Sequence, residues 1–273
     1  MINGTIGQTG FIPHPTNHIE ALNNGGGAPS MMMMVLAGQR KIPSTICITA
    51  DTGSEEDCLL NTGERVTMTQ FYNDVIEPLG IELGIKTYYA RGLDKNKKPL
   101  PSIMDKLRDG IIPGVPTYGS KGGQLKQGCT QKWKVRPIRQ TLRKLEAKTA
   151  RSALGLTMDE VERVRQHNDV KWHWVWWPLI ELGLYRAGIN ETLEKMSIPY
   201  MIASQCDNCP HKNGPRWERT SQEKLQELAM IEAGLGGTQF FTPLRIPLLE
   251  AVPKMINKEQ LTLPFCESGY CMT

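Results

Sequence analysis

Three consecutive glycines between a short strand pattern and an apolar run constrain the fold of this chain more than any other feature. Residues 18–22 predict a strand and residues 31–38 predict a helix. The connection contains Gly25, Gly26, Gly27, Ala28, Pro29 and Ser30. Glycine lets a backbone approach a ligand closely, and proline suits the first turn of a helix. A strand, a glycine turn and a helix start bring backbone N–H groups to one point, which suits a phosphate group. A tight turn without a ligand is the alternative.

The next apolar run indicates how the sheet is built. Residues 44–50 are apolar and β-branched, as in a parallel strand that is buried on both faces. A helix is predicted over 67–79 and a third strand over 85–90. This alternation predicts an α/β fold with a doubly wound parallel sheet. Ligands of such sheets bind at the carboxyl ends of the strands, where the glycine loop would lie.

The glycine loop and the turn after the second strand together resemble a known family. The second strand ends in Asp51, Thr52 and Gly53. This pairing resembles the phosphoadenosine-phosphosulfate (PAPS) reductase-like branch of the adenine-nucleotide α-hydrolase (PP-loop) superfamily, of the phage and bacterial type. The resemblance implies a nucleotide-binding protein, with ATP, adenylylsulfate or PAPS held by its phosphates on the loop and by its adenosine side near Asp51 and Thr52. The loop lacks the Lys and Asp of the ATP-cleaving S-G-G-K-D-S motif.

Two cysteine motifs extend the resemblance. Cys206 and Cys209 form a C-x-x-C-P knuckle, and Cys129 opens a C-T-x-x-W-K-x-x-P-I segment. In adenylylsulfate reductases, paired cysteines followed at long range by C-x-x-C bind an iron–sulfur cluster. The resemblance therefore implies a four-iron cluster on Cys129, Cys206 and Cys209, with Gly128 in place of one family cysteine. Thiolates also suit zinc or another structural metal, with His211 as a fourth ligand, and free thiols without a metal are the third alternative.

The last nine residues contain two further cysteines. Cys266 and Cys271 flank Glu-Ser-Gly-Tyr, a loose likeness to the cysteine-bearing tail of the sulfonucleotide reductases. The resemblance implies that one of them attacks sulfur as a thiolate, in an oxidoreductase or a sulfurtransferase that uses an external thiol electron donor. Alternatively, one of them is the fourth ligand of the cluster.

Between residues 121 and 151, Lys and Arg are opposed by Glu146 alone, which favours a phosphorylated ligand or a polyanion. The resemblance implies phosphate or sulfate contacts for Lys134, Arg136 and Arg139. It leaves two further functions open: ATP-dependent sulfur transfer to tRNA or DNA bound by this stretch, and an inactive nucleotide-binding module. Tryptophans at 172–177 favour an apolar strand or core edge over base stacking.

The sequence also predicts the domain organisation and the cellular setting of the chain. The predicted organisation is a nucleotide-binding α/β domain over residues 18–200 and a cysteine-rich region over 201–273 packed on the same domain. The sequence shows no secretory pattern and no apolar run that would span a membrane. Seven cysteines, an odd number, do not suggest a disulfide framework. A cytoplasmic protein is expected, phage-encoded in a host or bacterial, and a homo-oligomer is one possible assembly.

Overall fold

A five-stranded parallel sheet forms the centre of the computed structural model, which describes residues 17–111, 114–115, 117–164 and 170–257. Its strand order is β5-β2-β1-β7-β8, so the chain starts in the middle and winds outward in both directions. The five strands are β1 (His18–Asn23), β2 (Ile46–Asp51), β5 (Lys86–Arg91), β7 (Thr149–Ala153) and β8 (His173–Trp176). The α/β fold with a doubly wound parallel sheet that the sequence predicts is confirmed.

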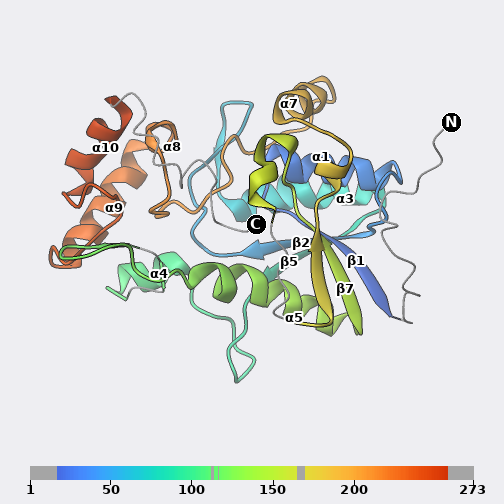
Figure 1. Cartoon of the computed structure of the whole chain (residues 1–273), viewed down its shortest axis with the longest axis horizontal. Helices are drawn as coiled ribbons and strands as arrows, with labels where there is room; N and C mark the ends of the chain where they lie inside the picture. The colour runs from blue at the N-terminus through green and yellow to red at the C-terminus, as the bar shows by residue number, and fades with distance from the viewer. Residues whose placement is uncertain (1–16, 112–113, 116, 165–169, 258–273) are drawn as a thin grey trace.

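Helices cover both faces of this sheet, as Figure 1 shows. The first seven α-helices along the chain are α1 (Ala28–Gly38), α2 (Met68–Phe71), α3 (Glu77–Leu83), α4 (Ile103–Arg108), α5 (Arg136–Lys144), α6 (Pro178–Glu181) and α7 (Arg186–Lys195). Two π-helical turns, η1 (Tyr72–Ile76) and η2 (Thr130–Val135), precede α3 and α5, and a 3-10 turn, η3 (Met158–Arg163), follows β7. The layers place α1, α3 and α7 on one face of the sheet and α5 on the other.

A smaller helical group lies at one end of the molecule, on the left of Figure 1. It contains α8 (Gly214–Glu218), α9 (Gln222–Gly234) and α10 (Leu248–Asn257). Two short antiparallel pairs complete the fold: β3 (Cys58–Leu59) with β4 (Arg65–Val66), and β6 (Tyr118–Gly119) with β9 (Gln239–Phe240). Among the described helices, none has the length and apolarity needed to cross a bilayer.

The main core lies between the sheet and α1. Helix α1 is buried along almost its whole length, including its four consecutive methionines at 31–34. Unbranched methionine side chains fill irregular gaps, which explains how a helix that is apolar all round packs between the sheet and other helices. All four methionines belong to the main core.

Two local sequence patterns predict helix starts that the structure does not have. Residues 157–160 form a capping-box pattern that predicts a helix over 158–166, but the described part is the 3-10 turn η3, and the Thr157 hydroxyl donates to Asp159 at 3.1 Å instead of capping. Asn190 is a candidate cap for a helix through Met196, whereas it lies inside α7, which begins four residues earlier. Most of the tryptophan-rich stretch forms β8, one of the two edge strands of the sheet.

We expect Met33→Ala to lower the free energy of unfolding by about 2–5 kcal/mol, because it leaves a cavity at a fully buried position. Met230→Ala is the matched control, since Met230 is 69% exposed and should change stability little. Urea denaturation measures both. Equal effects of the two substitutions would contradict the packing described for α1.

Candidate functional site

The glycine loop leads from β1 into α1 at the carboxyl edge of the sheet. Gly26 has a φ of +77°, and a Cβ there would lie 2.7 Å from the Met201 sulfur. Its N–H donates to Asn24 Oδ1 at 2.7 Å, and the Gly25 N–H donates to Ser30 Oγ at 3.4 Å. Two of the amides expected to meet a phosphate are therefore used inside the loop, and any anion there depends on additional groups.

One side of this loop packs on the segment that follows Tyr200. The Met201 N–H donates to Gly26 O at 2.8 Å, and the Ser204 hydroxyl donates to Gly25 O. Gly27 and Met201 form an isolated parallel bridge. The C-terminal part of the chain thus forms one wall of the site around the glycine loop.

Next to the loop lies a cavity of about 100 Å³ that we call the arginine cavity. It is lined by Gly27 and Ser30 at the start of α1 and by the arginines Arg163, Arg186 and Arg216. No single sequence motif contains these three arginines, because they are far apart in the chain. Guanidinium groups beside a helix N-terminus favour an anion, since both present N–H donors to it.

Internal hydrogen bonds hold these arginines in place. Arg186 Nη2 lies 2.9 Å from Glu160 Oε2, and Arg163 pairs with the same carboxylate. Arg216 Nη1 donates to Gln205 Oε1 at 2.8 Å. Among the described residues that line the cavity, three arginines accompany one carboxylate, that of Glu160, and this balance of charge favours a phosphate or sulfate.

The turn after β2 makes its own set of bonds. Asp51 Oδ1 accepts the Gly53 N–H at 2.8 Å, and Asp51 Oδ2 lies 3.5 Å from Arg91 Nη1. Gly53 has a φ of +56°, and a Cβ there would lie 2.2 Å from the Ser102 Cβ. Glycine is therefore required here for both conformation and space. Thr52 lines a second cavity, described next.

The structure brings the three long-range cysteines together. Cys129, Cys206 and Cys209 line one mainly apolar cavity of about 20 Å³, together with His211, and we call it the cysteine cavity. Cys129 directly precedes η2, and the other two belong to the knuckle at 206–209. None of the three is in a disulfide. The fold thus brings Cys129 and Cys206 to one cavity, although they are 77 positions apart in the sequence.

The donor types that line this cavity, three thiols and an imidazole, are those that a thiolate-bound metal group uses. Their arrangement does not amount to a finished coordination sphere. Within residues 17–257, apart from the short gaps, no three His, Cys, Asp or Glu side chains are grouped closely enough to hold a metal ion. Cys266 and Cys271, the two other predicted participants, lie outside the described residues.

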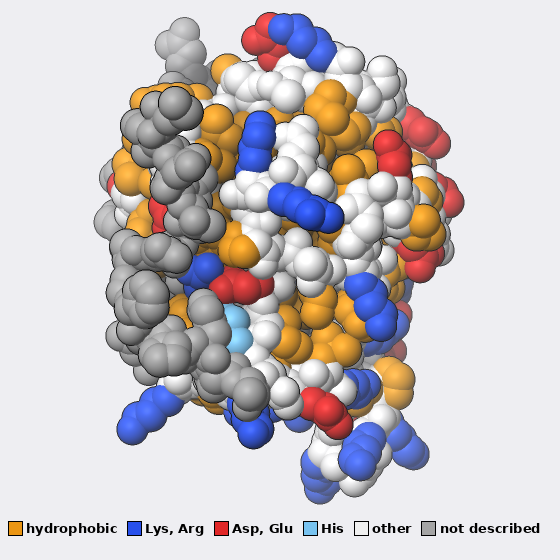
Figure 2. Space-filling model, turned by 90° about the vertical axis from the view of Figure 1, so that its right-hand side faces the viewer, with side chains coloured by type: hydrophobic (Ala, Val, Ile, Leu, Met, Phe, Trp, Pro, Cys, Tyr) orange, Lys and Arg blue, Asp and Glu red, His pale blue; other side chains and the backbone are white. Residues whose placement is uncertain are grey.

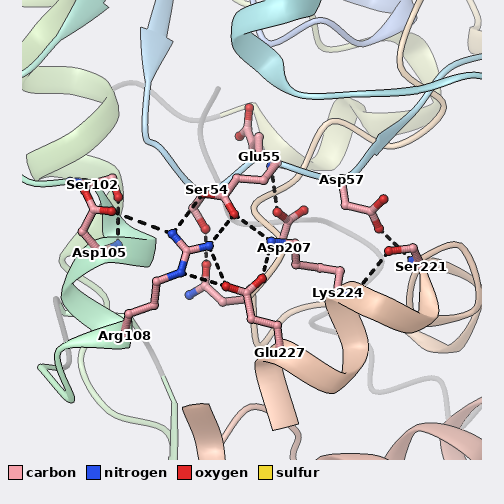
Figure 3. A network of polar contacts seen from close by, with 12 residues as sticks. Ser54, Glu55, Asp57, Ser102, Asp105, Arg108, Asp207, Ser221, Lys224 and Glu227 are labelled. Atoms are coloured by element: carbon pink, nitrogen blue, oxygen red, sulfur yellow. Dashed lines mark hydrogen bonds and ion pairs between the residues drawn. The ribbon is translucent and has the colours of Figure 1, made fainter. Parts of the chain in front are cut away.

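The knuckle is docked on the segment that follows β2 (Figure 3). The Asp207 N–H donates to Ser54 O at 2.6 Å, and the Glu56 N–H donates to Asp207 Oδ2 at 2.7 Å. Ser54 Oγ also donates to the side chain of Asn208. Burial raises the pKa of Asp207 to about 7, while Lys212 opposes the shift. The position of both knuckle cysteines is therefore set by the β2 turn.

Charged side chains brace this docking from outside, as Figure 3 shows. Arg108 Nη2 of α4 lies 2.8 Å from Glu56 Oε2 and 2.6 Å from Glu227 Oε1 of α9. Lys224 Nζ lies 2.7 Å from the same Glu56 oxygen. This network joins α4, α9 and the β2 turn. It holds the side chain of Glu56, and the N–H of the same residue binds Asp207 of the knuckle.

A buried ion pair lies between the glycine loop and the cysteine cavity. Lys134 Nζ is 3.7 Å from Glu55 Oε1, and the Cys206 thiol lies 3.7 Å from the same oxygen. Burial raises the pKa of Glu55, whereas Lys134 lowers it. Lys134 lines the cysteine cavity and also a small cavity beside Asn24 and Gly25. Its charge can therefore act on ligands at either place.

The other two predicted anion contacts lie elsewhere. Arg139 Nε donates to His173 Nδ1 at 3.2 Å at the start of β8, which is the amino end of that strand. Arg136 is exposed on α5. Neither residue lines the arginine cavity or the cysteine cavity.

Comparisons with known proteins were made for the sequence and the fold. No protein-family model matches the chain, and no curated protein matches it. A PAPS reductase from Candida auris, solved as a phosphate complex, is similar over 68% of this chain and 75% of its own, with 12% identity and a TM-score of 0.39. A U34-tRNA thiolase from Methanococcus maripaludis, solved with its 4Fe–4S cluster, is similar over 92% of this chain and 76% of its own, with 14% identity and a TM-score of 0.42.

One of these proteins is a PAPS reductase and the other a tRNA thiolase, and at TM-scores of 0.39 and 0.42 neither likeness assigns a role to this chain.

The buried ion pair gives a test of the site's construction. We expect Lys134→Met to lower the free energy of unfolding by about 3–5 kcal/mol, because it leaves the Glu55 carboxylate buried without its cation. The double variant Glu55→Gln/Lys134→Met should lose clearly less, since no charge is then left unpaired. Urea denaturation measures the free energy of unfolding of both variants. An equal loss of stability in the two would contradict an energetically coupled Lys134–Glu55 pair.

Proposed function

We propose that this chain binds an adenine nucleotide at the carboxyl edge of its sheet and uses cysteine thiols beside it for sulfonucleotide reduction or sulfur transfer. One observation carries this proposal: an arginine-lined cavity at the start of α1 and a three-cysteine cavity lie at the same sheet edge, joined by the segment 201–209. Thiols and an anion site at one edge suit a substrate in which sulfur is attached to a phosphate.

The phosphates of the nucleotide would occupy the arginine cavity. Its cations make charge-assisted hydrogen bonds to phosphate or sulfate, each of which is worth about 1.5–3 kcal/mol. Gly27 and Ser30 border the cavity at the start of α1, where the helix dipole adds to the attraction. The adenosine side would lie toward Asp51 and Thr52 at the end of β2, as the resemblance implies.

The cysteine cavity would hold an inorganic group. Cys129, Cys206 and Cys209 are the residues that would bind it, as an iron–sulfur cluster with four irons or as zinc with His211. Such a group supplies a fixed positive or redox-active centre close to the nucleotide. Its fourth ligand would come from His211 or from one of the cysteines at 266 and 271.

The reacting thiol would be Cys266 or Cys271. In a sulfonucleotide reduction, the thiolate attacks the sulfur, and the bond between that sulfur and the phosphate oxygen breaks as the nucleotide leaves with the electron pair. An external thiol donor then supplies two electrons and releases sulfite. In this scheme Lys134 stabilises negative charge between the two cavities. An inactive module would bind nucleotide without this turnover.

We expect Arg216→Gln to weaken binding of the preferred nucleotide by about 10- to 100-fold, because one charge-assisted contact is lost. Calorimetry with ATP, adenylylsulfate and PAPS measures the effect. Arg219→Gln is the matched control, since Arg219 is exposed and does not line the cavity. Unchanged affinity in the first variant, or the same loss in both, would contradict the arginine cavity as the phosphate site.

The metal assignment has its own test. Anaerobic purification should give about four irons per chain if a four-iron cluster is held, or one zinc if the alternative is correct. Cys129→Ser and Cys206→Ser should each lose most of the metal, whereas Cys47→Ala should retain it, because Cys47 is a core residue away from the cavity. Full metal content in the first two variants would contradict the cysteine cavity as the binding site.

A further inference from the structure

The solvent side of α5 carries cations on one face. Lys132, Arg136 and Arg143 are spaced by four and seven residues, so their side chains project from the same side of η2 and α5. Positions four residues apart on a helix are separated by about 6 Å along its axis. The opposite side, with Ile138 and Leu142, is buried against the sheet.

A second group of cations is fixed beside this face. The turn between β5 and α4 carries Lys95, Lys97 and Lys98, all of them exposed. The Gln140 side chain connects this turn to α5 by two hydrogen bonds to the backbone of Leu93. It accepts the Leu93 N–H at 3.0 Å and donates to Leu93 O at 3.2 Å. The six residues that we call the basic surface are Lys95, Lys97, Lys98, Lys132, Arg136 and Arg143.

The acidic residue inside this turn is occupied. Asp94 Oδ1 accepts the N–H groups of Asn96 and Lys98 at 2.8 and 2.9 Å, so it shapes the turn. None of the six cations forms an ion pair with a described residue. Figure 2 shows Lys and Arg side chains gathered along the lower edge of the molecule, the edge from which this turn projects in Figure 1.

Like charges are also close together here. Burial lowers the pKa of Lys132, and the nearby Lys106 and Arg136 lower it further. The Arg143 guanidinium lies 3.7 Å from the centre of the Trp172 ring and donates to Ala147 O at 2.8 Å. A crowd of cations without acidic partners costs folding energy, unless a polyanion neutralises it in the working state.

We propose that the basic surface binds the phosphodiester backbone of a nucleic acid. Repeated cations at helical spacing suit a ligand with one charge per nucleotide, whereas a single nucleotide fits the enclosed arginine cavity instead. The surface lies on α5 and the 94–98 turn and shares no residue with the arginine cavity. It therefore adds a macromolecular partner to the nucleotide chemistry and does not depend on the identity of that nucleotide.

The test compares two triple variants of the full chain with equal loss of charge. Lys95→Gln/Lys98→Gln/Arg136→Gln removes part of the basic surface. Lys41→Gln/Lys195→Gln/Lys254→Gln removes exposed cations elsewhere. Binding of a labelled 20-nucleotide RNA is measured over a range of salt concentrations, with a double-stranded DNA of equal length and polyglutamate as the other arms.

We expect the first variant to bind RNA at least tenfold more weakly, with a salt slope reduced by about 2, because about 0.7 counterion is released per phosphate contact on a single strand. The control variant should bind as the wild type does, and DNA in place of RNA would still support the proposal. Equal weakening in both variants, polyglutamate binding as tightly as nucleic acid, or no binding by the wild type would each overturn it. Thermal melts of both variants and unchanged nucleotide affinity show that folding and the arginine cavity are intact.

Discussion

The docking of the 206–209 knuckle on the β2 turn is the interaction on which the rest of the site depends. Two hydrogen bonds, from the Asp207 N–H to Ser54 O and from the Glu56 N–H to the Asp207 carboxylate, set the position of the cysteines relative to the sheet. Because these groups are buried, losing either bond would leave an unsatisfied polar group and cost about 1–3 kcal/mol. The charged network around Glu56 then resists sliding of α4 and α9. A C-terminal segment is thus held rigidly beside strands from the first third of the chain.

The same segment connects the two cavities. Residues 201–204 pack on the glycine loop, Gln205 binds Arg216, and Cys206 lies beside Glu55. An anion bound by Arg216 would therefore act on Gln205, the residue directly before the cavity thiol of Cys206. Lys134 provides a second link, since it lines the cysteine cavity and approaches Gly25 from the other side. The two cavities are therefore joined through short and well-packed connections.

The sequence predicted the parts of this site that depend on local patterns. The strand–loop–helix unit, the turn at Asp51 and the apolar methionine helix follow from periodicity, glycine and proline, which act over a few residues. The knuckle was recognisable because its two cysteines are close in sequence. Cys129 was placed with it only through a family resemblance, and the structure brings it to the same cavity.

The arginine cavity was not predictable in this way. Arg163, Arg186 and Arg216 come from a 3-10 turn, the start of α7 and α8, and only the tertiary fold makes them neighbours. The cations of the basic run at 121–151 lie in different places, since Lys134 lines the cysteine cavity whereas Arg139 donates to His173 at the opposite end of the strands. Charge density along a sequence does not say which face a helix buries. In α5 the choice is made by Ile138 and Leu142, which turn most of the cations outward.

The central claim is that an adenine nucleotide and an inorganic group share the carboxyl edge of this sheet. Anomalous diffraction from crystals grown anaerobically with adenylylsulfate tests it most directly. The account predicts nucleotide phosphate density within hydrogen-bonding distance of Arg216 and Ser30, and a metal peak between Cys129, Cys206 and Cys209. Nucleotide bound elsewhere, or a metal peak remote from these three sulfurs, would contradict it.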